Sequence, residues 1–176
     1  MTDLLSIVTG APGVGKTTVL HSLDGTIPWV TEPARELIAD RLAAGVETDM
    51  SRQESIDALL ARSIEKYQCA QATGTPTVFD RGIPDCIAYA LYLGADPGPS
   101  IEAAQLHRYH PRVLILGPWE EIYTIDDMRT MSFAQVLLFH DRVLEAYDIA
   151  GYTLVEVPRG TIADRAAFIE DHVASA

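Results

Sequence analysis

The chain alternates short apolar runs with longer stretches in which apolar residues recur at helical spacing. The apolar runs predict five buried strands, at residues 4–9, 28–31, 75–79, 112–116 and 153–157. Strands that alternate with helices need crossover connections, and such strands pair in parallel. We therefore predict an α/β fold, a three-layer α/β/α sandwich around a five-stranded parallel sheet.

Helical periodicity predicts the segments between these strands. We expect helices at residues 15–23, 33–44, 51–72, 84–93, 101–108 and 161–173, and one more that opens at Ser132. Two of them begin with capping boxes, Ser51-x-x-Glu54 and Ser132-x-x-Gln135, in which each side chain satisfies a free backbone N–H of the first turn. At roughly 100–200 residues per domain, a chain of 176 residues predicts one domain, residues 1–176.

A phosphate-binding motif follows the first predicted strand. Residues 10–17, Gly-Ala-Pro-Gly-Val-Gly-Lys-Thr, fit the pattern G-x-x-x-x-G-K-[ST] and open a helix, which is the context this loop needs. Its glycines let backbone N–H groups surround a phosphate, Lys16 supplies a cation, and Thr17 offers a hydroxyl to Mg²⁺. We expect ATP and Mg²⁺ as cofactors; the alternative is a glycine turn with an incidental lysine. The expected nucleotide-binding residues are Gly10, Ala11, Pro12, Gly13, Val14, Gly15, Lys16, Thr17 and Thr18.

Charged side chains also follow the third strand, at the edge where parallel sheets bind ligands. Asp80 stands in the manner of a Walker B acid and is a candidate Mg²⁺ ligand together with Thr17. Its neighbour Arg81 is suited to hold a phosphate or a substrate oxygen. The alternative is an Asp80–Arg81 pair tied up in a loop.

Three further charged residues follow the second and fifth strands. Glu32 is a candidate general base, with an N-terminal helix cap before Pro33 as the alternative. Arg35 is a candidate ligand for an acceptor's phosphate or carboxylate, and a solvated helix-face arginine is an equal reading. Arg159, after the fifth strand, is a candidate nucleotide contact. We expect a small-molecule acceptor near Glu32, Arg35, Arg81 and Asp85.

The segment at about residues 117–131 is polar and acidic and carries Trp119, Tyr123 and Arg129. In small phosphotransferases a lid at this place brings an arginine onto the transferring phosphoryl group. Arg129 is therefore a candidate catalytic residue, with an ordinary surface arginine as the alternative. The two aromatic residues either pack at the base of the lid or stack on a ring. The full set of catalytic candidates is Lys16, Glu32, Asp80, Arg81 and Arg129.

Composition restricts the partners. The chain has 13 Lys and Arg against 25 Asp and Glu, a net charge of −12, which disfavours nucleic-acid tracks and anionic membranes. No apolar run reaches the roughly 18 residues of a membrane span, and the first residues lack the basic region of a signal peptide, so we expect a cytoplasmic protein. We expect Cys69 and Cys86 to be buried, reduced thiols. No spacing of Cys or His indicates a metal site.

Five blocks of the sequence together resemble the NadR-like AAA-domain family of small P-loop proteins, related to ribosylnicotinamide, nucleoside and nucleotide kinases. They are GAPGVGKTT, TEPARELI, FDRGIPDCIAY, PWEEIYTIDDMR and GYTLVEVPRGTIADRAAFI. The resemblance implies the strand order 2-3-1-4-5. It also implies Glu32 as base, Asp80 as metal ligand or base, and Arg81 as a ligand of substrate or phosphate. The sequence departs from nucleotide kinases in having one apparent lid arginine, Arg129.

Two functions from different classes fit these features. The first is an ATP-dependent kinase that transfers the γ-phosphoryl group to a hydroxyl or phosphate of a nucleoside-like or other small acceptor. The alternative is a nucleotide-binding switch or slow NTPase that acts through a protein partner, which the single lid arginine favours. The acceptor, the choice between ATP and GTP, and the choice between monomer and homodimer stay open at this point.

Overall fold

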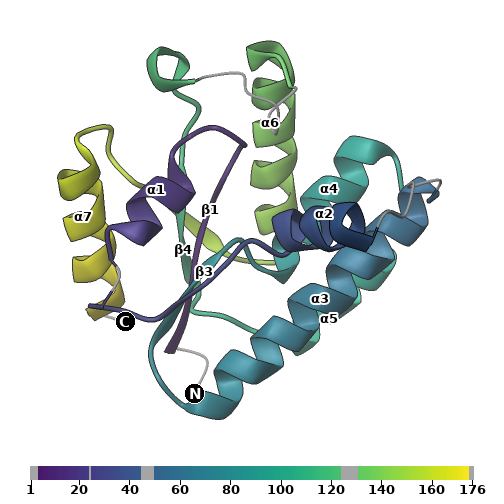
Figure 1. The fold of residues 1–176 in the computed structure, drawn as a ribbon, viewed down its shortest axis with the longest axis horizontal. Helices are drawn as coiled ribbons and strands as arrows, with labels where there is room; N and C mark the ends of the chain where they lie inside the picture. Colours follow the sequence, from purple (N-terminus) through teal and green to yellow (C-terminus); the bar gives the residue numbers. More distant parts are fainter. Residues whose placement is uncertain (1–3, 24, 45–49, 124–130, 175–176) are drawn as a thin grey trace.

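A parallel sheet of five strands in the order β2-β3-β1-β4-β5 forms the middle of the molecule in the computed structural model (Figure 1). The structure describes residues 4–23, 25–44, 50–123 and 131–174. The strands are β1 (Leu5–Gly10), β2 (Trp29–Val30), β3 (Thr77–Asp80), β4 (Arg112–Leu116) and β5 (Thr153–Glu156). Their order and parallel pairing confirm the predicted fold class.

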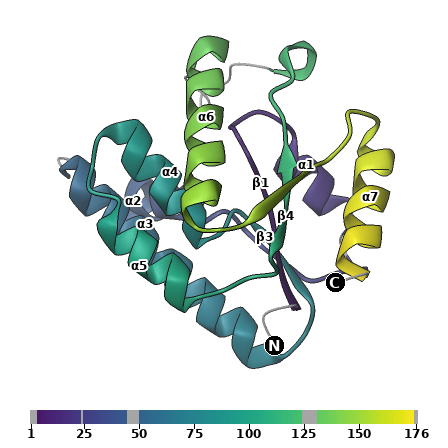
Figure 2. The ribbon, with the colours of Figure 1, turned by 180° about the vertical axis from the view of Figure 1, so that it is seen from behind.

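Helices cover both faces of the sheet. They are α1 (Lys16–His21), α2 (Pro33–Ala44), α3 (Arg52–Thr73), α4 (Ile83–Leu93), α5 (Gly98–Leu106), α6 (Phe133–Ile149) and α7 (Ile162–Ala174), with a short 3₁₀ helix η2 (Glu120–Ile122). On one face α1 packs against α7; on the other, α4 contacts α3, α5 and α6 (Figures 1 and 2). This is the predicted three-layer arrangement.

Both predicted capping boxes are present. The Ser51 hydroxyl accepts a hydrogen bond from the backbone N–H of Glu54 (3.2 Å), and the Glu54 carboxylate accepts one from the backbone N–H of Ser51 (2.8 Å). Ser132 and Gln135 make the same reciprocal pair at the start of α6. Each box supplies acceptors for N–H groups that the first turn leaves unpaired, which fixes where the two long helices begin.

Several predicted boundaries were wrong by one to three residues. Strand β2 has only two residues, not the four of 28–31. Strand β3 begins at Thr77 rather than at residue 75, because Pro76 has no N–H for the ladder. Helix α5 begins at Gly98 rather than at residue 101, where Pro99 suits the first turn and the Asp96 side chain accepts the N–H of Gly98 (2.9 Å).

The expectation of two buried thiols was half wrong. Cys86 is buried under α3, but Cys69 is exposed. Cys69 lies on the side of α3 that faces β2, and the short edge strand does not cover it. Among the described residues, no helix is both long and apolar enough to cross a membrane.

The register of the sheet brings the functional strand ends together. All six residues of β1 are buried, and Val8 pairs with Asp80 of β3, so the loop after β1 and the end of β3 lie at the same edge. On the other flank of β1, Gly10 pairs with Leu116 of β4. The phosphate loop therefore starts between two neighbouring strands, beside Asp80.

Candidate nucleotide and acceptor site

The phosphate loop closes on itself around Lys16. Gly15, the residue before α1, adopts φ 85°, a left-handed conformation that glycine takes without steric cost. Lys16 is only 5% exposed, and its Nζ donates to the carbonyl oxygens of Gly10 and Ala11, both at 3.0 Å. Burial, with a further contribution from the cation of Arg81, lowers the pKa of Lys16 to about 8. The lysine is thus held inside the loop by acceptors that a phosphate oxygen would replace.

Thr17 and Asp80 come together as predicted for a metal site. The Thr17 hydroxyl donates to Oδ2 of Asp80 at 2.8 Å, while Oδ1 of Asp80 is buried with no hydrogen-bond partner. Burial raises the pKa of Asp80. An unpaired buried carboxylate oxygen beside a hydroxyl suits Mg²⁺, which prefers oxygen ligands and usually keeps several waters or phosphate oxygens. Thr17 and Asp80 are the residues of this site that could hold the ion. No cluster of three or more His, Cys, Asp or Glu side chains that could hold a metal occurs among the described residues.

Arg81 is the centre of a buried ion network. It is 3% exposed; its Nε donates to Glu32 at 2.8 Å and its Nη1 donates to Asp85 at 2.9 Å. The guanidinium also lies 5.6 Å from the ring centroid of Tyr89 and 5.5 Å from that of Phe139. The Asp80–Arg81 pair, which was the alternative to the predicted roles of these two residues, is not formed, because Arg81 turns to carboxylates from the β2–α2 turn and from α4.

Asp85 is fully engaged by protein donors. Its Oδ1 accepts from the Thr9 hydroxyl (2.7 Å) and from Arg81, and its Oδ2 accepts from the Tyr147 hydroxyl (2.6 Å) and the backbone N–H of Gly82 (2.9 Å). At 2% exposure it is surrounded by these partners. Asp85 therefore lies behind Arg81 and ties three elements together, rather than facing an acceptor.

The backbone at this place is shaped to serve the network. Arg81 adopts φ 72°, and among the described residues other than glycine it alone has a positive φ. A left-handed arginine costs on the order of 1 kcal/mol, which the two buried ion pairs offset. Gly82 is needed next to it because a Cβ there would lie 2.4 Å from the Ile7 side chain. The turn after β3 thus aims Arg81 back into the fold.

Glu32 holds both arginines of this region. Its Oε1 accepts from Arg81 and from the Tyr89 hydroxyl (3.3 Å), and its Oε2 accepts from the Nε of Arg35 (3.0 Å). Burial alone would raise the pKa of Glu32, but Arg81, Lys16 and Arg35 outweigh it and lower that pKa to about 2. The carboxylate is therefore ionised and engaged, which disfavours it as a proton acceptor.

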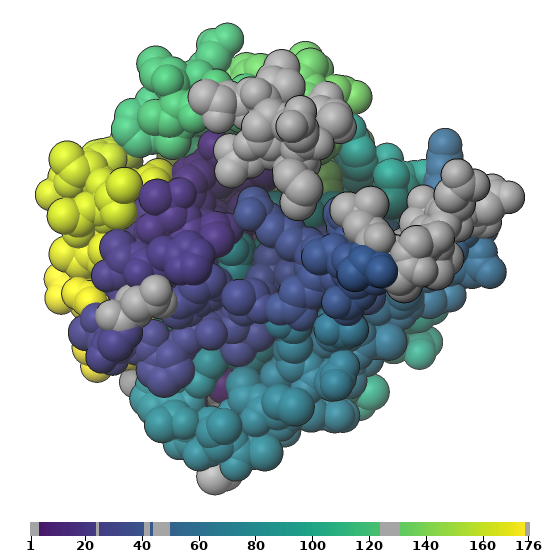
Figure 3. Space-filling model, viewed as in Figure 1, coloured from purple at the N-terminus to yellow at the C-terminus, as the bar shows by residue number. Residues whose placement is uncertain are grey.

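A cleft of about 330 Å³ lies next to the Thr17–Asp80 pair. It is lined from α1, from the β2–α2 segment and from α2, on the face of the molecule that Figure 3 shows (purple and blue). Arg35, whose side chain is 46% exposed, faces it, whereas Arg81 is not among its lining residues. The lining residues are Thr17, His21, Trp29, Thr31, Glu32, Arg35, Glu36, Ala39 and Asp80.

The opposite side of the phosphate loop carries an aromatic–arginine cluster. The Trp119 ring is near two cations, with the guanidinium of Arg159 at 5.6 Å and that of Arg165 at 5.9 Å from the ring centroid. Arg159 is exposed and donates to the Pro118 carbonyl oxygen (2.9 Å). Arg165 is buried and donates to the carbonyl oxygen of Val14 (3.1 Å). The β5–α7 connection and α7 thus reach the loop from the side away from Glu32.

The base of the lid-like segment touches the same loop. The Tyr123 ring packs against Gly13 so closely that a Cβ on the glycine would lie 2.5 Å from it, and the Tyr123 hydroxyl donates to the Met131 carbonyl oxygen. Trp119 therefore packs against two arginine side chains and Tyr123 packs against the phosphate loop, and the lid itself stays a prediction. Arg129, the predicted lid arginine, lies outside the described residues.

Sequence reasoning missed four contributors: Thr9, Tyr89, Tyr147 and Arg165. The two tyrosines and Thr9 sit in patterns that indicate only core, since a buried hydroxyl has the same spacing as an apolar residue. Arg165 carries a usable signal, because it occupies the buried face of α7 with Ala166 and Ile169. A charged residue on an apolar stripe indicates a buried partner, here the phosphate loop.

Comparison with known proteins follows this geometry. A family model described as an AAA domain matches residues 5–165. The chain belongs to this AAA-domain family. No curated protein sequence matches this AAA-domain chain at a significant level. The match confirms the resemblance noted in the five sequence blocks.

Solved structures place the AAA-domain chain among P-loop kinases in fold. It is similar to a NadR protein in complex with NR (TM-score 0.71, 16% identity), covering 97% of this chain and 50% of that one. It is also similar to thymidylate kinase from Candida albicans, with a TM-score of 0.67 and 17% identity. That match covers 97% of this chain and 91% of the kinase. A third similar structure is thymidylate kinase from Ehrlichia chaffeensis, with a TM-score of 0.64 and 17% identity. The match covers 96% of this chain and 98% of that one. The chain spans half of the NadR chain and nearly all of the two thymidylate kinases.

Proposed function

We propose that this AAA-domain protein is an ATP- and Mg²⁺-dependent kinase that phosphorylates a hydroxyl or phosphate of a small, nucleoside-like acceptor. The observation that carries the proposal is the Thr17–Asp80 pair, which leaves one buried carboxylate oxygen unpartnered at the mouth of a cleft. Two halves of a phosphotransfer site, a phosphate loop and an acceptor-sized hollow, thereby share one edge of the sheet. The kinase fold of the structural neighbours supports the same class.

The nucleotide would occupy the phosphate loop. Residues 10–18 supply backbone N–H groups and the helix N-terminus for the phosphates, and Lys16 would exchange its two carbonyl partners for phosphate oxygens. Thr17 and Asp80 would hold Mg²⁺, which neutralises charge on the phosphates when bound. Arg159 stays a proposed nucleotide contact through its place beside Trp119. Arg129 stays the proposed lid arginine.

The acceptor would occupy the cleft lined from α1 and α2. Arg35 is the cation that faces it, because Nε is engaged by Glu32 while the outer part of the guanidinium is exposed. Glu32 fits a positioning role, since it fixes Arg35 and Arg81, better than the role of general base that the resemblance implied. An arginine at this place favours an acceptor that carries an anionic or strongly polar group.

The test separates nucleotide binding from phosphotransfer. Lys16→Ala should weaken Mg·ATP binding about tenfold or more, the value of one charge-assisted hydrogen bond, measured by calorimetry at unchanged melting temperature. Arg142→Ala, which removes an exposed cation on α6, is the matched control. Wild-type protein with Mg·ATP is then screened against nucleosides, ribosides and nucleoside monophosphates, with phosphorylated product read by mass spectrometry. Full ATP affinity in a folded Lys16→Ala protein would contradict the nucleotide site.

One contact favours the second candidate, a nucleotide-dependent switch. Tyr123 rests on Gly13, so the segment after β4 touches the loop whose shape depends on the nucleotide. If ATP binds well and no acceptor in the screen is phosphorylated, the kinase proposal fails and the nucleotide-dependent switch is favoured. ATP and GTP hydrolysis with and without acceptors distinguishes the two, because a kinase accelerates only with its acceptor.

A further inference from the structure

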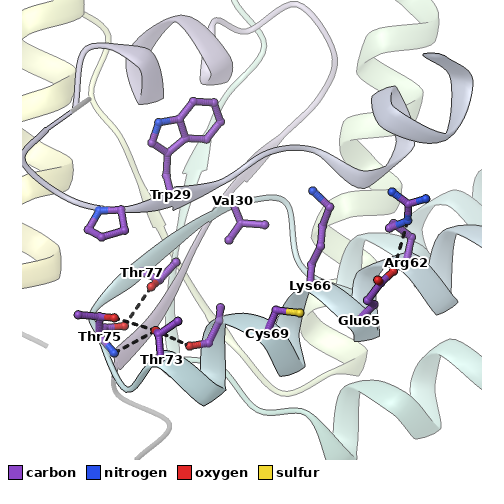
Figure 4. A pocket seen from close by; sticks show the side chains of 11 residues that line it. Trp29, Val30, Arg62, Glu65, Lys66, Cys69, Thr73, Thr75 and Thr77 are labelled. Carbon is purple, nitrogen blue, oxygen red and sulfur yellow. Dashed lines mark hydrogen bonds and ion pairs between the residues drawn. The ribbon is translucent and has the colours of Figure 1, made fainter. Parts of the chain in front are cut away.

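A second groove, of about 440 Å³, lies between β2 and α3, outside the nucleotide loop and the cleft described above (Figure 4). Val30 points into it from β2, and Lys66 and Cys69 point into it from α3, whereas Trp29 points away towards α1 (Figure 4). The volume is in the range of small-molecule sites. The groove is open because β2, the edge strand, is only two residues long.

The charged groups at the mouth of the groove already have partners. Lys66 Nζ donates to the carbonyl oxygen (3.1 Å) and the hydroxyl (2.9 Å) of Thr31 and to the Glu36 carboxylate. These bonds use all three N–H groups of the Lys66 ammonium. Arg62 pairs with Glu36 (3.3 Å) and Asp40 (3.1 Å). A charged ligand would have to break these pairs, so the groove favours an uncharged one.

Three threonines, Thr73, Thr75 and Thr77, line the other end of the groove. The Thr73 hydroxyl donates to the Ala70 carbonyl oxygen (2.8 Å), the Thr75 hydroxyl donates to that of Thr73 (2.7 Å), and the Thr77 hydroxyl donates to the Thr75 carbonyl oxygen (3.0 Å) (Figure 4). Each hydroxyl has a single hydrogen, and that hydrogen already takes part in one of these hydrogen bonds. The Thr73 oxygen also accepts from the backbone N–H of Thr75 (3.3 Å), so both of its lone pairs are used. The hydroxyl oxygens of Thr75 and Thr77 have lone pairs that can only accept, so this end of the groove calls for a donor.

The walls between these two ends are apolar: Pro28, Val30, Ala70 and the sulfur of Cys69. We propose that the groove binds an uncharged, largely apolar small molecule that carries one N–H or O–H donor for the threonine end. Lys66, on the rim, holds Thr31, the residue before Glu32. A ligand seated here is therefore placed to regulate the cleft, a consequence that rests on the proposed function, whereas the binding itself does not.

Cys69 reports on occupancy directly. It is exposed in the groove, while Cys86 is buried with its pKa raised to about 12 by burial, so alkylation by iodoacetamide reads Cys69. Indole is the probe, 1-methylindole lacks its donor, and indole-3-acetate adds a charge. We expect millimolar indole to slow alkylation of Cys69 several-fold. 1-Methylindole should bind roughly 2- to 10-fold more weakly, the value of one neutral hydrogen bond, and indole-3-acetate should not protect.

A pair of variants on α3 localises the effect. Thr73→Phe fills the groove and leaves Cys69 in place; Ala72→Phe adds the same ring at an exposed position outside the lining. Protection by indole, taken as the ratio of alkylation rates without and with it, should vanish in Thr73→Phe and persist in Ala72→Phe. No protection of the wild type, or equal protection in both variants, overturns the site. Equal protection by indole-3-acetate overturns the uncharged ligand class.

Discussion

Arg81 and Arg159 each follow a strand and each lie against an aromatic ring, yet their surroundings are opposite. Arg81 is 3% exposed and reaches two carboxylates within 3 Å. Arg159 is exposed and has a backbone carbonyl and the face of Trp119. Two buried counter-charges fix a cation, whereas a carbonyl and a ring leave it free to exchange partners. The first kind of arginine organises a site and the second kind is available to a ligand.

The strongest test of this difference between the two arginines is to remove the buried cation of Arg81. Arg81→Met should lower the free energy of unfolding by about 3–5 kcal/mol, because Glu32 and Asp85 would remain buried without their partner. Denaturant unfolding measures this loss as a lower midpoint at an unchanged slope. Arg159→Met is the control and should be close to neutral. A loss below about 1 kcal/mol for Arg81→Met would mean that the two arginines are alike.

The next effect concerns pH. The folded pKa of Glu32, about 2, is below the ordinary value of 4.5, so its stabilisation is complete above the ordinary value and is lost as pH falls towards 2. Over that range the loss is on the order of 3 kcal/mol. Glu32→Gln should reduce the acid-induced fall in unfolding free energy between these pH values, measured by denaturant titration at several pH values.

An exposed carboxylate on α6 provides the control for this pH experiment. Glu145→Gln should change the acid limb of the stability curve little, because the ion pair of Glu145 with Arg142 is exposed to solvent. If Glu32→Gln and Glu145→Gln give the same curve as the wild type, the Arg81 network does not hold Glu32 in its ionised form.

The same contrast explains which parts of the molecule were predictable. The strands, the helix positions and the capping boxes follow from local patterns, and the phosphate loop follows from glycine geometry and one lysine. The strand order follows from the family resemblance. The network around Arg81 does not follow from local patterns. Its partners Glu32 and Asp85, and the Asp85 partners Thr9 and Tyr147, come from four separate segments that meet only in the fold. The sequence identifies the charged residues at the strand ends, but it does not show which of them form ion pairs with one another.

Cys69 and Asp85 illustrate the two directions of error. Cys69 was expected to be buried from residue type alone, but the short β2 leaves its helix face open. Asp85 was expected near an acceptor from its place after β3, but four protein donors surround it. Burial and hydrogen-bond saturation are properties of packing, so they appear only when neighbouring elements are placed.

The smallest expected effect tests the exposed arginine. Arg159→Ala should change the unfolding free energy by less than about 0.5 kcal/mol, since the side chain is exposed and bonds one carbonyl. Its contact with Trp119 should still be visible by fluorescence in a Trp29→Phe background, where Trp119 is the one remaining tryptophan. Loss of the cation should shift the Trp119 emission there, and Arg142→Ala should not. A loss above about 1 kcal/mol would instead make Arg159 a structural cation like Arg81, and a nucleotide would then have to displace a fixed contact rather than capture a free one.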